Sequence, residues 1–310
     1  MPPGSYVILR RVALTDDIRA GCARVAAKAR RVRIDEDAIE AYAATLPAEP
    51  PPAPDLGPGA SEEERAAFQI TLNAINFGSG WFPTLRKPAG LSGFRTVEAG
   101  LRARGPWTAS ELTAIETPEV AATFGQDPAH ELMALFTLAL RELGERLTVE
   151  YFGRFLGLVR SAEGSAELLA ETLATWPTWH DVSSHEGERV PFYKRAQIAA
   201  ADLHLAGIAP AEDIDRLTLF ADNLVPHVLR LDGVLEFDAR LVGRIEDGLL
   251  LEHGSPQEVE IRACALHAVE LLVAAHGDTT ATAVDNALWN RGALPRYKAQ
   301  PRHRARTTAY

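Results

Sequence analysis

Apolar residues recur along most of this chain at the spacing of an α-helix. Within residues 128–147, one helical stripe is formed by Leu132, Leu135, Phe136, Ala139 and Leu143. Within residues 255–275, a second stripe is formed by Ile261, Cys264, Ala265, Ala268, Leu272 and Ala275. The two-residue alternation of a half-buried strand is hard to find. The pattern therefore predicts a mostly helical protein.

Signals for the start of a helix support this prediction. Ser61 with Glu64, and Ser255 with Glu258, have the spacing of a capping box, in which the two residues satisfy each other's backbone donors. Pro191 suits the first turn of a helix that would run through about residue 206. We expect a helix to begin at each of these three places.

The chain length fits one large domain. A single core rarely grows beyond about 250–300 residues, and this chain has 310. Residues 47–60, PAEPPPAPDLGPGA, are too rich in proline for a helix. We interpret them as a linker that joins an N-terminal helical pair to the main body within one domain spanning residues 1–310.

Charge and cysteine content exclude several classes of protein. The net charge is −10, with 32 basic and 42 acidic residues, so binding of nucleic acid by the whole surface is not expected. The two cysteines, Cys22 and Cys264, make no disulfide framework and fit a reducing cytosol. No run approaches the ~20 apolar residues of a membrane helix. We expect a cytoplasmic protein without membrane contact.

Common cofactor and metal motifs are absent. The sequence contains no GxGxxG, no GxxxxGK[ST], no HExxH, no CxxC and no GxSxG. Its nine histidines never take the spacing of a metal-binding helix. We therefore expect neither a cofactor nor a metal, and these motifs leave the function open.

Five segments, in this order, resemble the queuosine salvage protein family, the queuosine 5′-phosphate N-glycosylases. They are LNAINFGSGWF at 72–82, the stretch 155–203 that contains VPFYKRAQ, LFADNLVPHVLRLDGVL at 219–235, GSPQEVEIRACALHAVELL at 254–272, and PRHRARTTAY at 301–310. The resemblance implies a compact all-α fold similar to helix-hairpin-helix DNA glycosylases. It also implies hydrolysis of the N-glycosidic bond of queuosine 5′-phosphate, which releases the 7-deazaguanine base queuine for salvage into tRNA. Composition alone suggests a solvated end or a nucleic-acid arm for the basic tail, whereas the family pattern implies a docked tail.

The resemblance assigns two catalytic residues. Asp222 matches the family's catalytic aspartate in FAD-x-x-x-P, and a carboxylate can stabilise positive charge that develops on the ribose C1′. The alternative is a helix cap, since Pro226 lies close by. Lys194 matches an active-site lysine that would contact the 5′-phosphate or ribose. The alternative for Lys194 is a solvated helix lysine.

The segment 72–82 is expected to hold the base. Phe77 or Trp81 would stack on a flat heteroaromatic ring, and Asn73 and Asn76 would bind its polar edge. Equally, Phe77 could belong to the core and the asparagines could cap or turn. The family pattern has Asp at the position of Asn73, which bears on the base accepted.

His227 and Glu260 complete the expected substrate-binding set. Glu260 or Arg262 would tie the helix at 255–275 to the site, while the capping box accounts for Glu258. The expected partner is a small-molecule nucleotide, with no direct nucleic-acid contact and the oligomeric state left open. Alternative functions are an N-glycosylase for a different modified or deazapurine nucleotide, a non-catalytic nucleobase-binding protein, and a nucleic-acid glycosylase.

Overall fold

The computed structural model describes residues 13–50, 55–57 and 59–310, and helices dominate this part of the chain. The α-helices are α1 Leu14–Lys28, α2 Ile39–Ala43, α3 Glu62–Ala74, α4 Gly93–Arg104, α5 Ala109–Ala114, α6 Thr117–Thr123, α7 Glu131–Tyr151, α8 Phe155–Ser161, α9 Ala166–Ala174, α10 Lys194–Leu205, α11 Val225–Leu231, α12 Ala239–Glu246, α13 Pro256–His276, α14 Ala281–Arg291 and α15 Pro295–Lys298. The strands are β1 Val32–Ile34, β2 Val182–His185, β3 Glu188–Pro191 and β4 Leu235–Phe237. The prediction of a mostly helical protein is confirmed.

The all-α prediction is wrong in detail, because two small antiparallel sheets are present. β1 pairs with β4, and β2 pairs with β3. Each strand has only three or four residues, too few for an alternating pattern to show in the sequence. Glu186 and Gly187, both with positive φ, form the two-residue turn between β2 and β3.

The helix expected to begin at Pro191 begins later. Pro191 is the last residue of β3 and pairs with Val182. Tyr193 then takes a left-handed conformation with φ 49°, and α10 starts at Lys194. The proline therefore ends a strand rather than opening a helix, and α10 begins three residues later.

The two predicted stripes form helix faces in the structure. In α7, Leu132, Phe136 and Leu143 are buried. In α13 the apolar stripe is buried except for Ala275, which is exposed near the helix end. The first half of α13 is buried on all sides, because α1, α2, α11 and α14 all pack against it.

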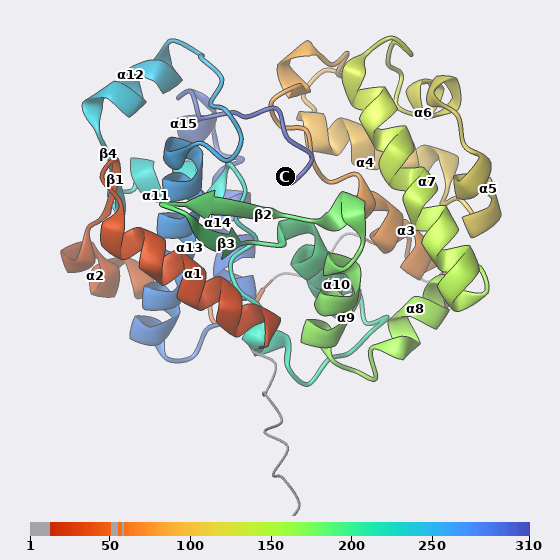
Figure 1. Ribbon diagram of the computed structural model, residues 1–310, viewed down its shortest axis with the longest axis horizontal. Helices are drawn as coiled ribbons and strands as arrows, with labels where there is room; N and C mark the ends of the chain where they lie inside the picture. The colour runs from red at the N-terminus through yellow and green to blue at the C-terminus, as the bar shows by residue number, and fades with distance from the viewer. Residues whose placement is uncertain (1–12, 51–54, 58) are drawn as a thin grey trace, which may run out of the picture.

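The helices form two groups that meet around the end of the chain. In Figure 1, helices α3 to α9 lie to the right, and α1, α2 and α11 to α15 lie to the left. The C-terminal segment enters from α15 and ends between them (Figure 1).

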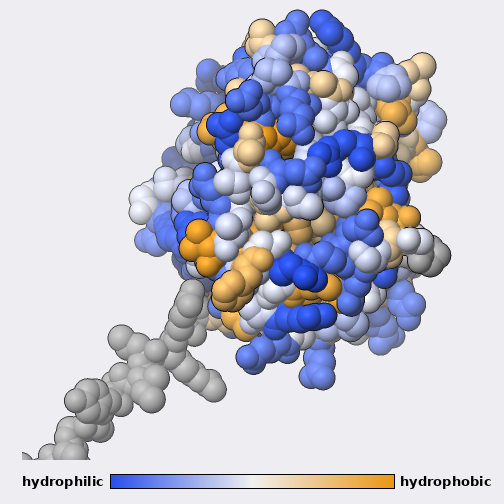
Figure 2. Space-filling view, turned by 90° about the vertical axis from the view of Figure 1, so that its right-hand side faces the viewer, coloured by the Kyte–Doolittle hydropathy of each residue, from blue (hydrophilic) through white to orange (hydrophobic). Residues whose placement is uncertain are grey.

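Figure 2 shows hydrophilic and hydrophobic residues interspersed on one face of the molecule. None of the helices in the described part of the chain is long and apolar enough to cross a membrane.

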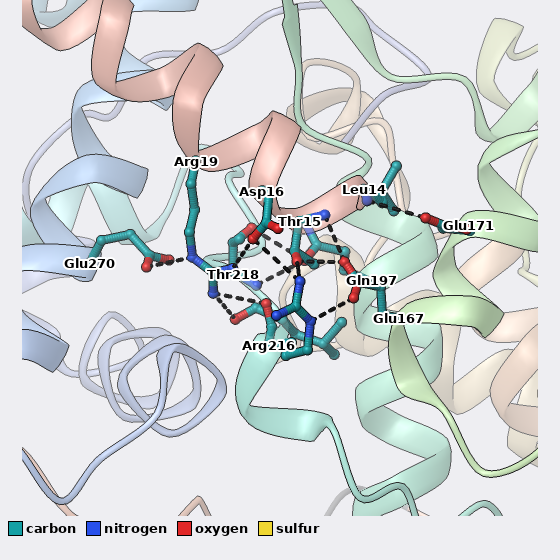
Figure 3. A network of polar contacts seen from close by, with 11 residues as sticks. Leu14, Thr15, Asp16, Arg19, Glu167, Glu171, Gln197, Arg216, Thr218 and Glu270 are labelled. Atoms are coloured by element: carbon teal, nitrogen blue, oxygen red, sulfur yellow. Dashed lines mark hydrogen bonds and ion pairs between the residues drawn. The ribbon is translucent and has the colours of Figure 1, made fainter. Parts of the chain in front are cut away.

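Helix α1 is fastened to the rest of the body by polar contacts (Figure 3). Arg19 donates to Glu270 of α13 at 2.7 Å, and the Thr15 hydroxyl donates to Glu167 of α9 at 2.5 Å. Arg216 donates to the other Glu167 oxygen at 2.6 Å.

The expected linker at 47–60 is described only in part, because residues 51–54 and 58 lie outside the described residues. Within it, Asp55 accepts a hydrogen bond from Arg65 of α3 at 2.5 Å.

Candidate active site

Lys194 is a buried lysine at the first position of α10. Its side chain lies below the surface, and Nζ donates to the Asn76 backbone oxygen at 2.9 Å. Burial lowers the pKa of Lys194 to about 8, and the nearby charges of Asp222 and Asp285 oppose this shift. A solvated surface lysine is therefore excluded, and the ammonium lies within electrostatic range of carboxylates.

Asp222 precedes α11 and is half-buried. Its Oδ1 accepts hydrogen bonds from the backbone N–H groups of Leu224 at 2.7 Å and Val225 at 3.1 Å. Leu224 is the N-cap residue of α11, so Asp222 lies two residues before the cap and forms an Asx-type turn instead of the helix cap of the alternative interpretation. The turn uses Oδ1 only, so Oδ2 is available for another partner, and the same side chain interacts electrostatically with Lys194. The turn and a chemical role are compatible here.

Two further carboxyl groups share this electrostatic environment, and the sequence did not reveal them. Asp202 lies eight residues after Lys194 in α10, on the same helix face. Burial raises the pKa of Asp202 to about 6, and the hydrogen bond from Asn73 opposes this shift. Asp285 of α14 is buried, and burial together with Asp222 raises its pKa well above the usual range. The i, i+8 spacing of Asp202 from Lys194 was the one available sequence signal.

A second cation approaches Asp222 from the C-terminal segment. Arg302 is half-buried, and its Nε is without a hydrogen-bond partner in the described structure. Burial lowers the pKa of Arg302, and the charge of Asp222 opposes this effect. The basic tail therefore contributes a positive charge to the site.

Arg262 and Asp181 connect the two halves of the site. Arg262 Nη1 and Nη2 donate to the two Asp181 oxygens at 2.9 and 2.7 Å, and Arg262 Nε donates to the Ala221 backbone oxygen at 3.0 Å. Asp181 Oδ2 also accepts from the Lys194 backbone N–H at 3.0 Å. One buried ion pair thus fixes the residue before Asp222 and the start of the helix that carries Lys194. The expectation that Glu260 or Arg262 ties α13 to the site is met by Arg262.

The asparagines of the segment 72–82 form a small polar network. Asn73 Nδ2 donates to Asp202 Oδ2 at 2.8 Å, and Asn73 Oδ1 accepts from Asn76 Nδ2 at 3.1 Å. The Asn76 backbone oxygen receives Lys194 Nζ. This segment is therefore linked directly to the lysine and to Asp202.

The two aromatic residues of this segment are engaged by the protein. Phe77 is buried edge-on against Phe136, with the Arg195 guanidinium 4.9 Å from the centre of its ring. Trp81 is buried and donates its indole N–H to Glu131 at 2.7 Å. The position of Phe77 fits the core interpretation.

His227 and Glu260 make contacts elsewhere. His227 Nε2 lies 3.0 Å from the Tyr297 backbone oxygen, and burial lowers the pKa of His227 to about 4. Glu260 accepts from the backbone N–H groups of Arg30 at 3.1 Å and Arg31 at 2.7 Å. The His227 contact holds α15, and the Glu260 contacts hold the two residues just before β1. None of these contacts joins Glu260 to Lys194 or Asp222.

The two expected capping boxes have different outcomes. The pair Ser61 and Glu64 forms a complete box. The Ser255 hydroxyl accepts from the Glu258 backbone, but the Glu258 carboxylate turns to the Gly254 N–H at 3.0 Å and lies 3.6 Å from Arg262. His253 and Arg262 lower the pKa of Glu258 to about 2, against the effect of burial. Glu258 is therefore a fully buried ionic partner, and the box at Ser255 is only half formed.

The tail is docked, as the family pattern implies. The His303 backbone oxygen accepts from Asn223 Nδ2 at 3.0 Å, and the Tyr310 backbone oxygen accepts from the Gly78 N–H at 3.0 Å. The Tyr310 ring lies 4.6 Å from the Arg262 guanidinium. The tail thus touches both the segment after Asp222 and the loop after Phe77.

Gly80 makes this docking possible. A Cβ atom at Gly80 would lie 2.3 Å from the Ala305 backbone oxygen, a contact that backbone atoms cannot relieve without moving. Ala305 also pairs with Leu251 in an isolated bridge. The tail backbone therefore passes directly over this glycine.

Two cavities lie beside other parts of the fold. An open cleft of about 550 Å³ is lined by residues that include Arg31, Phe237 and His267. A smaller cavity of about 240 Å³ is lined by residues that include Arg189 and Tyr193, next to Lys194 in sequence. Within the described residues, no group of three or more His, Cys, Asp or Glu side chains is arranged to hold a metal ion.

Comparison with known proteins gives one consistent result. A family model described as "Queuosine salvage protein" matches residues 56–310. A protein of Sphaerobacter thermophilus, named queuosine 5′-phosphate N-glycosylase/hydrolase, is 34% identical over 308 residues, covering 93% of this chain and 95% of that protein. Proteins with the same name from Dictyostelium discoideum (34% identical over 215 residues, 65% of each chain) and Bos taurus (39% over 138 residues, 43% of this chain and 40% of that protein) are also similar. The matched region contains every residue of the site described above.

Proposed function

The chain belongs to the queuosine salvage protein family, and on this premise we propose that it hydrolyses the N-glycosidic bond of queuosine 5′-phosphate and releases queuine. The observation that carries the proposal is that the ammonium of buried Lys194 lies within electrostatic range of Asp222, with one residue coming from each of two matched segments. The products are the free base and ribose 5-phosphate. Water is the second reactant.

Asp222 is the carboxylate that acts at the ribose C1′ in this proposal. Cleavage of an N-glycosidic bond builds positive charge on C1′, and a nearby carboxylate stabilises that charge, attacks it or deprotonates the incoming water. Its Oδ1 is fixed by two backbone N–H groups, so the orientation of Oδ2 is set before substrate arrives. A fixed carboxylate needs no reorganisation during the reaction.

Lys194 and Arg302 supply positive charge around Asp222. An ammonium ion or a guanidinium is suited to a phosphate, and Arg302 has an Nε without a protein partner. We assign Lys194 to the ribose or the 5′-phosphate and place Arg302 on the phosphate side. The chain's net charge of −10 makes such a local positive site necessary for an anionic substrate.

The segment that contains Asn73 and Asn76 is assigned to the base. An amide side chain offers both a donor and an acceptor to a purine-like edge, whereas a carboxylate only accepts. Here the Asn73 amide is engaged by Asp202 and Asn76, so binding of the base by Asn73 would exchange these contacts for contacts with the base. Trp81 keeps its expected role at the base as part of the proposal, whereas no substrate contact is proposed for His227 and Glu260, whose contacts lie at Tyr297 and at Arg30 and Arg31.

We also propose that residues 1–310 form one domain whose fold is similar to helix-hairpin-helix DNA glycosylases. Support for the single domain comes from the main cluster of buried apolar residues, which includes Ile18, Ile39 and Leu266, so the N-terminal helices share a core with the main body. We place the enzyme in the cytoplasm, where its free buried cysteines would stay reduced.

A substrate panel tests the proposed function. Hydrolysis rates of queuosine 5′-phosphate, queuosine and guanosine 5′-phosphate are compared with the purified protein. The proposal requires the fastest turnover with queuosine 5′-phosphate. An equal or faster rate with guanosine 5′-phosphate favours a glycosylase for a different purine nucleotide, the alternative motivated by Asn73.

A further inference from the structure

Asp285 has a buried carboxyl oxygen that no other group satisfies. The residue lies on α14 with 6% of its surface exposed, and its Oδ1 is without a hydrogen-bond partner in the described structure. Its carboxyl group also accepts a hydrogen bond from the Phe220 backbone. Buried polar atoms almost always have partners, so a free buried oxygen calls for a functional explanation.

The surroundings of Asp285 are those of the proposed reaction site. The charged groups that act on it are Asp222, Lys194 and Asp202. Its backbone partner Phe220 lies two residues before Asp222. Asp285 is therefore anchored to the segment that carries the proposed C1′ carboxylate.

Two neighbouring carboxyl groups rarely both ionise, because like charges repel and burial penalises each charge. Burial and the charge of Asp222 together raise the pKa of Asp285 well above the usual range. Asp222 is the more solvated of the two and accepts two backbone hydrogen bonds. Asp285 is thus the member of the pair that favours its protonated form, which is the form that a glycosidase's general acid needs.

We infer that Asp285 is a second catalytic residue, the acid whose free oxygen gives a proton to a ring nitrogen of the departing base. This inference rests on the proposed function and adds the group that assists the leaving base. A 7-deaza base has carbon in place of N7, so the usual protonation site of a purine is absent. Proton delivery to another ring nitrogen then has to come from a positioned group.

The proton balance closes with the two carboxyl groups. The C1′–N bond breaks, its electron pair stays with the base, and the base takes a proton from Asp285. A water oxygen bonds to C1′, and its released proton goes to Asp222. Asp285 ends ionised and Asp222 protonated, and exchange of protons with solvent restores both.

Asp202 is the competing candidate for this role. Burial also raises the pKa of Asp202, but to only about 6, and its Oδ2 is occupied by Asn73. Asp285 is the carboxyl group with a buried oxygen that has no hydrogen-bond partner among the described residues. The geometry therefore favours Asp285, and Asp202→Asn becomes the matched comparison.

A change of leaving group separates an acid from a structural residue. Asp285→Asn, Asp202→Asn and the wild type are assayed with queuosine 5′-phosphate and with 4-nitrophenyl ribofuranoside 5-phosphate, whose nitrophenolate leaves without a proton. We expect Asp285→Asn to lower kcat about 10²–10⁴-fold on the nucleotide. On the nitrophenyl compound, kcat of the variant should stay within about threefold of the wild-type value. Asparagine keeps an acceptor for the Phe220 N–H, so the fold is retained.

The inference is overturned if Asp285→Asn loses kcat equally on both substrates, or loses none on the nucleotide. It is also overturned if Asp202→Asn, and not Asp285→Asn, shows the loss that is selective for the nucleotide. Difference infrared spectroscopy at pH 7 gives a readout independent of turnover: a protonated carboxyl band present in the wild type and missing in Asp285→Asn is expected. Absence of that difference also overturns the inference. Failure of the proposed function is distinct, because the wild type itself would then release no queuine.

Discussion

Arg262 and Asp181 form a buried, two-armed ion pair that holds the two sides of the candidate site in register. The Nη1–Oδ1 and Nη2–Oδ2 distances are 2.9 and 2.7 Å. The same guanidinium binds the Ala221 backbone oxygen, and the same carboxylate binds the Lys194 backbone N–H. The distance between Asp222 and Lys194 therefore depends on a pair that belongs to neither residue.

Replacing Arg262 by lysine tests this positioning role. Lysine keeps the charge but cannot donate to both Asp181 oxygens and to Ala221 in one plane. We expect kcat on queuosine 5′-phosphate to fall about 10–100-fold with a smaller change in KM, because a small misplacement of reacting groups is costly. Arg291→Lys is the matched control, since Arg291 pairs with Asp232 outside the site. Similar losses in both variants would assign Arg262 to general stability.

The pH dependence of activity should report Lys194. Its pKa is lowered to about 8 by burial, so the ammonium is charged below that pH and loses its proton above it. If the reaction needs the charged form, kcat/KM falls as pH rises through about 8. The arginine of Lys194→Arg stays charged at higher pH, so the basic limb of the kcat/KM profile should move up by at least one pH unit in this variant. An unchanged basic limb in this variant would assign the limb to another group, with Asp285 the first to examine.

Gly80 tests the importance of the docked tail. Gly80→Ala would place a methyl group 2.3 Å from the Ala305 backbone oxygen and push the tail, with Arg302, away from Asp222. We expect KM for the phosphorylated substrate to rise at least tenfold. Gly243→Ala in α12 is the control, because a Cβ there meets nothing within 4 Å. Unaltered kinetics in Gly80→Ala would remove the tail from the account of substrate binding.

Two buried histidines should make stability depend on pH. Burial lowers the pKa of His303 to about 3 and that of His227 to about 4, so the unfolded chain binds protons that the folded chain does not. Their contribution is complete above the unfolded pKa of about 6.5 and is lost as pH falls toward the folded values. Urea unfolding at pH 6.5 and 5 should differ by about 1–2 kcal/mol for each histidine.

His303→Gln should reduce this pH dependence, since glutamine does not titrate. The exposed His180 provides the control, and His180→Gln should keep the wild-type slope. A slope that is unchanged in His303→Gln would show that other groups set the acid stability.

Much of the helical fold was predictable because long periodic segments and complete capping signals are local features. The buried stripe of α7 and the Ser61 box are examples. The short strands β2 and β3 were missed, because a four-residue pairing is stabilised by its partner strand and by the turn at Gly187 rather than by its own pattern. The place of Pro191 at the end of β3 was not predictable for the same reason, since it depends on pairing with Val182.

The site was predictable where family motifs carry it and obscure where tertiary structure assembles it. Lys194 and Asp222 lie on different elements, and the ion pair of Arg262 and Asp181 links the backbone at Lys194 to the backbone just before Asp222, a link with no sequence signal. Asp285 lies in an ordinary helix, and only its burial and its free oxygen distinguish it. For Glu258, the local capping pattern concealed an ionic role that appears only when Arg262 packs beside it.

Release of queuine by the wild type and by Asp222→Asn is the most direct test of the central claim. Purified proteins are incubated with queuosine 5′-phosphate, and the free base is followed by mass spectrometry. The account predicts steady release by the wild type and a loss of at least 10³-fold in the variant, which keeps Oδ1 as the acceptor for the Leu224 and Val225 N–H groups but lacks the negative charge. Release at an undiminished rate by Asp222→Asn, or none from a folded wild type, would contradict it.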